Sequence, residues 1–95
     1  MGDLSEQEIA EGCKLFNDGS KRYVNSNGVY HRIGGPAVTL TGGTKVWYQN
    51  GKRHRLDGPA AEWASIPYQW YFEGELIDCV TQEEFERLVK LKVFW

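Results

Sequence analysis

The sequence predicts an α+β fold, in which an antiparallel β-meander built of hairpin repeats of about 23 residues is flanked by an N-terminal and a C-terminal amphipathic helix. Three observations predict it. The chain contains an internal repeat in strict register, glycine-containing turn signals separate its short strand-like segments, and a helix-start signal stands near each end. We expect one domain, 1–95, with helices at 5–17 and 81–92 and repeats at 21–78.

The repeat consists of identities that recur at one offset without a gap. His31, Arg32, Gly35, Pro36, Ala37, Trp47, Tyr48 and Gly51 match His54, Arg55, Gly58, Pro59, Ala60, Trp70, Tyr71 and Gly74. Such register indicates one supersecondary unit stacked on itself. Residues 23–30 resemble the back half of a degenerate first unit, and Ile77-Asp78 stands where a third His-Arg would fall. This divergence is typical of terminal units, whose outer faces have no neighbour.

The first predicted element is a helix from Ser5 to about residue 17. Ser5 can cap it while Glu8 bonds back to the Ser5 backbone, with Leu4 and Ile9 spaced as a hydrophobic staple. One face would carry Ile9, Cys13 and Phe16. The turn-forming residues 17–20 would end the helix.

Seven segments between the helices have the composition of strands, namely 29–33, 37–41, 44–49, 52–56, 60–64, 68–72 and 75–78. Gly42-Gly43 and Asn50-Gly51 have the form of two-residue hairpin turns, and Glu73-Gly74 occupies the equivalent place in the last unit. Because these spacings leave no room for helical crossovers, the strands should pair antiparallel.

The C-terminal helix has the stronger start signal. Thr81 is its predicted cap, Glu84 closes the capping box, and Val80 and Phe85 form the expected staple. An apolar stripe follows, made of Phe85, Leu88 and Val89. The apolar residues after it, Val93, Phe94 and Trp95, are candidates for a contact with the sheet or with another chain.

The repeated residues have structural interpretations. Gly-Pro at 35–36 and 58–59 would interrupt the ladder, and Ala37 and Ala60 are small where the chain re-enters the sheet. Because side chains alternate along a strand, Trp47 and Trp70 should form a ladder on one face and Tyr48 and Tyr71 on the other, with one ladder buried.

The His-Arg pairs at 31–32 and 54–55 fit either a ligand site or a side-chain network that satisfies turn backbone and holds repeats together. Asp57 is close enough in sequence to pair with Arg55 or to orient His54. The first copy has Gly34 in place of Asp57, which weakens any His-Asp couple required in every unit. The network is therefore the favoured interpretation.

Composition narrows the classes of function. The net charge of −2 argues against a protein built for nucleic acid, although residues 52–55 are consecutively basic. No apolar run approaches a membrane span, and the acidic start lacks signal-peptide character, so we expect a cytoplasmic protein. Cys13 and Cys79 match no metal or redox spacing and are interpreted as small apolar residues. We see no catalytic motif and expect no enzyme activity, cofactor or metal.

The repeat motif resembles a known family. The segments HRIGGPAVTLTGGTKVWYQNGK and HRLDGPAAEWASIPYQWYFEGE are similar to the short MORN-like β-hairpin repeats found in bacteriophages and large DNA viruses. The resemblance covers residues 21–88, and Gly34 and Glu73 depart from the motif. It implies a repeat sheet, a phage origin and a location in the host cytoplasm, but no shared activity.

Three functions follow as hypotheses. The leading one is a phage-encoded binding protein that inhibits or redirects a host protein, such as an antiviral defence component, because exposed Trp, Tyr and Arg dominate binding hot spots. The alternatives are a sponge for a small nucleotide signal and a structural module that forms homo-oligomers through a sheet edge or through residues 93–95. The candidate binding residues are Trp47, Tyr48, Arg53, Arg55, Trp63, Trp70 and Tyr71.

Overall fold

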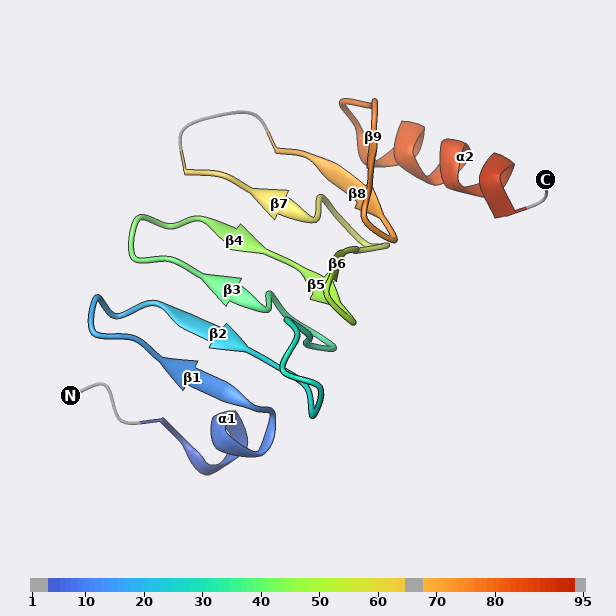
Figure 1. Cartoon of the computed structure of the whole chain (residues 1–95). Helices are drawn as coiled ribbons and strands as arrows, with labels where there is room; N and C mark the ends of the chain where they lie inside the picture. Colours follow the sequence, from blue (N-terminus) through green and yellow to red (C-terminus); the bar gives the residue numbers. More distant parts are fainter. Residues whose placement is uncertain (1–3, 65–67, 94–95) are drawn as a thin grey trace.

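The computed structural model describes residues 4–64 and 68–93, and it confirms the predicted α+β class (Figure 1). Antiparallel hairpins are stacked into an elongated array with one helix near each end. In chain order the elements are α1 (Glu6–Ala10), β1 (Cys13–Leu15), β2 (Lys21–Tyr23), β3 (Val38–Thr39), β4 (Lys45–Val46), β5 (Tyr48–Gln49), β6 (Lys52–Arg53), β7 (Ala61–Glu62), β8 (Trp70–Phe72), β9 (Glu75–Ile77) and α2 (Gln82–Val93).

Each repeat contributes two kinds of hairpin. Long hairpins build a five-stranded sheet in the order β1-β2-β3-β4-β7, whereas β5-β6 and β8-β9 are short hairpins outside it. Figure 1 shows the short hairpins at one side of the stack. Consecutive units are joined by backbone bonds at equivalent places, because the amides of Gly51 and Gly74 donate to the carbonyls of Tyr30 and Arg53, each at 2.8 Å. The strand order therefore skips β5 and β6, and β4 pairs directly with β7.

The two short hairpins confirm the turn prediction. Asn50 and Gly51 have φ of 52° and 82°, and Glu73 and Gly74 have φ of 47° and 89°, as a two-residue turn with both residues left-handed requires. The prediction for Gly42-Gly43 is wrong. The Leu40 amide donates to the Thr44 carbonyl at 2.9 Å, so the loop has three residues, and Gly43 alone takes a positive φ of 100°.

The N-terminal helix is much shorter than predicted. Its capping box is present, with Ser5 Oγ accepting from the Glu8 amide at 3.1 Å, but the helix ends at Ala10. Gly12 then has φ +84°, and a Cβ there would lie 2.1 Å from the Val24 carbonyl oxygen. Cys13–Leu15 pairs with β2 instead of continuing the helix. Ile9 and Phe16 are consequently exposed, so the predicted shared helix face does not exist.

The C-terminal helix agrees with its prediction. Thr81 Oγ1 accepts from the Glu84 amide at 3.1 Å, although Glu84 Oε1 accepts from the Val80 amide rather than that of Thr81. Val80 is 82% exposed, so the predicted staple is absent. Phe85 and Val89 pack on Trp70, while Phe94 and Trp95 lie outside the described residues.

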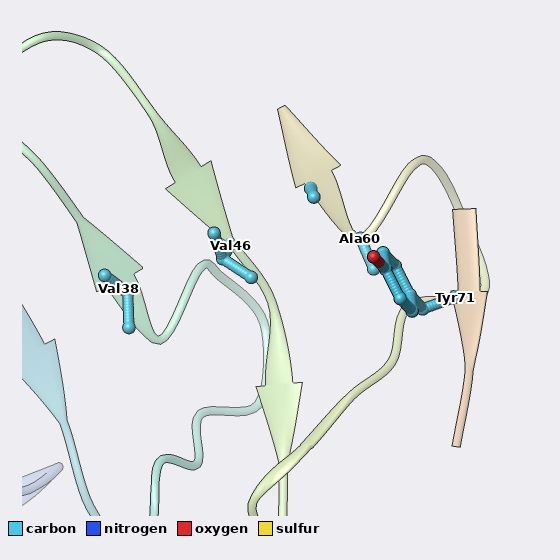
Figure 2. Close-up of a cluster of buried hydrophobic side chains, with 5 residues drawn as sticks. Val38, Val46, Ala60 and Tyr71 are labelled. Carbon is cyan, nitrogen blue, oxygen red and sulfur yellow. The ribbon is translucent and has the colours of Figure 1, made fainter. Parts of the chain in front are cut away.

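The central core lies between the five-stranded sheet and the short hairpins. Figure 2 shows Val38 and Val46 beside each other, with the Tyr71 ring directed at Ala60. Ala37 and Ala60 are completely buried, which agrees with the requirement for small side chains there. The prediction of one buried aromatic ladder is wrong. Trp70 is buried under α2 and Tyr71 is buried in the central core, whereas Trp47 and Tyr48 are both half-buried.

Candidate binding surface

The structure separates the seven predicted binding residues into three places. Tyr48, Arg53, Trp63 and Tyr71 lie together on one face of the array. Trp47 and Arg55 pack on each other on the opposite side, and Trp70 lies under α2 with its indole N–H donated to Gln82 Oε1 at 2.8 Å. Of the three groups, only the first gathers several aromatic side chains around one arginine.

Arg55 is fully engaged within its own repeat. Its guanidinium lies 3.8 Å from the centre of the Trp47 ring, donates to the Pro59 carbonyl at 3.1 Å, and pairs with Glu62 at 3.0 Å. A further pair joins it to Asp57 at 2.9 Å, and this hydrogen bond holds the pKa of the Asp57 carboxyl below its usual range. The motif residue Arg55 therefore acts as an internal clamp.

Arg32 repeats this arrangement with one exchange. It lies 4.0 Å from the Tyr23 ring centre and donates to the Pro36 carbonyl at 3.3 Å. Gly34 offers no carboxylate, and the acid beside Arg32 is instead Glu11, at 3.4 Å, from the turn after α1. The N-terminal segment thus supplies the negative charge that the first repeat lacks.

The two motif histidines bind turn backbone. His31 Nδ1 accepts from the Asn50 amide at 3.0 Å, and His54 Nδ1 accepts from the Glu73 amide at 2.9 Å. Each histidine therefore satisfies an amide in the short hairpin of the following unit. This geometry supports the network interpretation of the His-Arg pairs, and it leaves Asp57 without the predicted role of orienting His54.

The strand register places a row of side chains on the face of the sheet opposite to Glu62, the partner of Arg55. Lys14 is paired with Arg22, Arg22 with Val38, Val38 with Val46, and Val46 with Ala61, so all five project to one side. The aromatic rings of the short hairpins cover the middle of this row. We define the arginine–aromatic face as the charged end of this row together with the arginine and aromatic side chains packed beside it. Its members are Lys14, Phe16, Arg22, Tyr30, Tyr48, Arg53, Trp63 and the buried Tyr71.

Arg53 lies at the centre of one half of the arginine–aromatic face. Its Nε donates to Tyr48 Oη at 3.3 Å and its Nη1 donates to Tyr71 Oη at 2.9 Å. The guanidinium carbon lies 5.1 Å from the Tyr71 ring centre and 5.7 Å from that of Trp63. The hydrogen bond to Tyr48 is the main cause that raises the pKa of Arg53 above its usual value.

Arg22 occupies the other half in a similar way. Its Nη1 donates to Tyr30 Oη at 2.9 Å, and its guanidinium carbon lies 4.6 Å from the Phe16 ring centre. The Tyr30 and Tyr48 rings make an edge-to-face contact at 5.2 Å. This contact joins the two arginine clusters into one surface.

Charge is divided unequally between the two faces. Lys21 is paired with Glu8 and Arg55 with Glu62, and the register puts these pairs on the face opposite to Arg22. Among the described residues, no carboxylate lies within 4.0 Å of Lys14, Arg22 or Arg53. The three cations of the arginine–aromatic face therefore form no ion pair with a described residue, and the nearest charge effect is that of Arg22 on the exposed Asp18.

Sequence reasoning found Tyr48, Arg53, Trp63 and Tyr71 but missed the N-terminal half of the face. Phe16 was assigned to a helix. Arg22 is not a conserved position of the repeat, because the next hairpin has valine at the position opposite it, so comparing the repeats does not single out Arg22. Lys14 and Phe16 are two positions apart and would share a face of a strand, but this spacing indicates a common surface only if residues 13–15 are read as a strand.

The described residues provide neither a metal site nor a membrane-spanning helix. No three His, Cys, Asp or Glu side chains in residues 4–64 and 68–93 are grouped to hold a metal ion. None of the helices described is both long and apolar enough for a membrane crossing. Comparison of the chain with protein-family models, curated proteins and solved structures gives no match.

Proposed function

We propose that this chain is a non-enzymatic binding protein whose arginine–aromatic face binds an acidic surface of a partner protein. The observation that carries the proposal is the contrast between two kinds of arginine. Arg32 and Arg55 lie against carboxylates, whereas Arg22 and Arg53 are held among aromatic rings by tyrosine hydroxyls. A cation without a neighbouring acid attracts an anionic partner.

The face also has the residue types that dominate protein interfaces. Arginine, tyrosine and tryptophan supply large contact area at a small entropic cost, and here their side chains are fixed by mutual contacts. The Nη2 groups of Arg22 and Arg53 make no hydrogen bond to the described residues, so each can donate to a carboxylate.

The MORN-like resemblance gives the proposal its biological setting. Because the resemblance implies a phage origin, we propose a partner in the host cytoplasm, where binding would inhibit or redirect a protein such as a component of antiviral defence. An arrangement for a nucleotide sponge is less well supported. The hollow between Arg32 and Arg55 measures about 230 Å³, below the range typical of ligand pockets, and both arginines there face carboxylates.

The test is capture from a bacterial host lysate with tagged protein and mass spectrometry. Arg22→Gln and Arg53→Gln each remove one charge from the arginine–aromatic face, while Lys45→Gln is the matched control on the opposite face. We expect a protein that wild type and Lys45→Gln retain, that both arginine variants lose, and that elutes with added salt.

Circular dichroism must first show that each variant is folded, because Arg53 also binds two tyrosines. Equal capture by all four proteins would contradict the proposal. A thermal shift of wild type with cyclic or linear nucleotides, absent in Arg53→Gln, would favour the nucleotide sponge instead.

A further inference from the structure

A stripe of four side chains runs along the outer side of α2. Within the helix, Glu84, Arg87 and Leu91 are spaced by three and four positions, which brings their side chains onto one face. Val80 precedes the helix and lines one hollow together with Glu84 and Arg87. Val80 is 82% and Leu91 55% exposed, and the charged side chains between them are also solvent accessible. The core-facing residues of α2, Phe85 and Val89, lie on another face, so the fold does not explain this stripe.

A hollow lies at each end of the stripe. The first, of about 440 Å³, is lined by Val80, Thr81, Glu83, Glu84 and Arg87. The second, also of about 440 Å³, lies between β9 and α2 and is lined by Leu76, Leu88 and Leu91. Each hollow therefore adjoins one exposed apolar side chain of the stripe.

We propose that a second copy of this chain covers this stripe, with the two α2 helices packed antiparallel about a twofold axis. In that arrangement Val80 of each copy meets Leu91 of the other, and Glu84 of each copy meets Arg87 of the other. The stripe is self-complementary only in this direction, because its residue order, apolar, acidic, basic, apolar, pairs opposite charges when one copy is reversed.

The charge of the whole helix favours the same direction. Its first turn carries Glu83 and Glu84, and its last turn carries Lys90 and Lys92. Antiparallel helices bring the acidic end of one copy to the basic end of the other, whereas parallel helices would bring like charges together. Within one chain Glu84 and Arg87 are 4.0 Å apart, so the second copy completes an alternating ring of four charges.

The sheet edge is a poorer contact for a second copy. Self-pairing of β1 about its middle residue would oppose Lys14 to Lys14, and like charges directly opposite each other destabilise strand pairing. The α2 contact is short, about 16 Å along the helix at 1.5 Å per residue. It is smaller than a standard interface, so association is weak and depends on concentration. The stripe and the arginine–aromatic face share no residue, and this inference does not rest on the proposed function.

Sedimentation velocity of the full chain over a wide concentration range tests the inference. For wild type we expect the average mass to rise from 10.9 kDa toward twice that value. Arg87→Glu and Glu84→Arg should each stay monomeric, because each brings like charges together. An equimolar mixture of the two variants should form dimers, because both charge contacts between the chains are then attractive. Lys52→Glu, a matched charge reversal at an exposed residue outside α2, should associate like wild type.

Leu91→Asp gives a second test that leaves the helix cap intact, and it should abolish association while circular dichroism remains that of wild type. Wild type that stays monomeric at every concentration would overturn the inference. So would dimerisation of Arg87→Glu or Leu91→Asp, or a mixture of folded Arg87→Glu and Glu84→Arg that does not associate.

Discussion

Gly58→Ala should destabilise the protein through Arg55 alone. A Cβ at residue 58 would lie 2.7 Å from Arg55 Cζ and 3.0 Å from its Nε and Nη1. The guanidinium would have to shift, which weakens its contacts with the Trp47 ring and the Pro59 carbonyl. Gly58 has no positive φ, so alanine itself adds no backbone strain.

The magnitude follows from the contacts at risk. Losing part of a cation–π contact costs about 0.5–2 kcal/mol, and weakening one hydrogen bond to a charged donor costs about 1.5–3 kcal/mol. Against this, replacing glycine by alanine restricts the unfolded chain and contributes about 0.4–1 kcal/mol to stability. We expect a net loss of about 1–3 kcal/mol, which for a domain of this size lowers the thermal midpoint by about 5–20 °C.

A double-mutant cycle measures this coupling. Thermal and urea unfolding are recorded for wild type, Gly58→Ala, Arg55→Ala and the double variant. In the Arg55→Ala background, Gly58→Ala should be neutral or slightly stabilising, because the obstructing atoms are gone. An equal loss in both backgrounds would refute the reasoning and place the strain in the backbone. Gly35→Ala with Arg32→Ala repeats the experiment in the first unit, where the shortest distance is 2.9 Å.

Three further predictions concern single positions. Glu73 has φ +47° without being glycine, so Glu73→Asn should stabilise by about 0.5–1 kcal/mol in urea unfolding, and a loss of stability would contradict this strain. Phe85→Ala removes a side chain that is 1% exposed and should cost about 3–5 kcal/mol by the same assay, whereas a loss below about 1 kcal/mol would mean that α2 is not docked by this residue. Hydrogen bonds from Ser20 lower the pKa of Asp18 below the usual value of 3.8. The ionised Asp18 carboxylate therefore stabilises the fold above that pH, and this stabilisation is lost as pH falls through the folded pKa. The thermal midpoint should decline on acidification, and less steeply in Asp18→Asn.

Local chemistry made several elements predictable. The turns at 50–51 and 73–74 require residues in the left-handed conformation. The first turn has Asn50-Gly51, and the second has glycine at its second position, Gly74. The Thr81 cap and the apolar stripe of α2 are likewise local signals. The predicted length of the N-terminal helix was wrong, because a capping box indicates only where a helix begins and not where it ends. Beyond the first turn, the tight approach of Gly12 to Val24 and the pairing of β1 with β2 outweigh helical propensity.

The candidate surface was predictable only in part, and for a related reason. Trp47 and Tyr48 are adjacent and equally half-buried, but only Tyr48 contributes to the arginine–aromatic face, because strand alternation sends their side chains to opposite sides. The role of each arginine depends on which acid the fold brings near it. Glu11 is far from Arg32 in sequence and still takes the place of the missing Asp57 equivalent.

By itself, the sequence determined the repeat, the two-residue turns at 50–51 and 73–74 and the start of each terminal helix, since these depend on backbone conformations that neighbouring residues set. Only the tertiary structure decided that residues 13–15 form a strand, that the short hairpins fold out of the main sheet, and that Arg22 and Arg53 form no ion pair with a described carboxylate. Those features arise from pairing between segments distant in the chain, and no local pattern encodes which charges such pairing brings together.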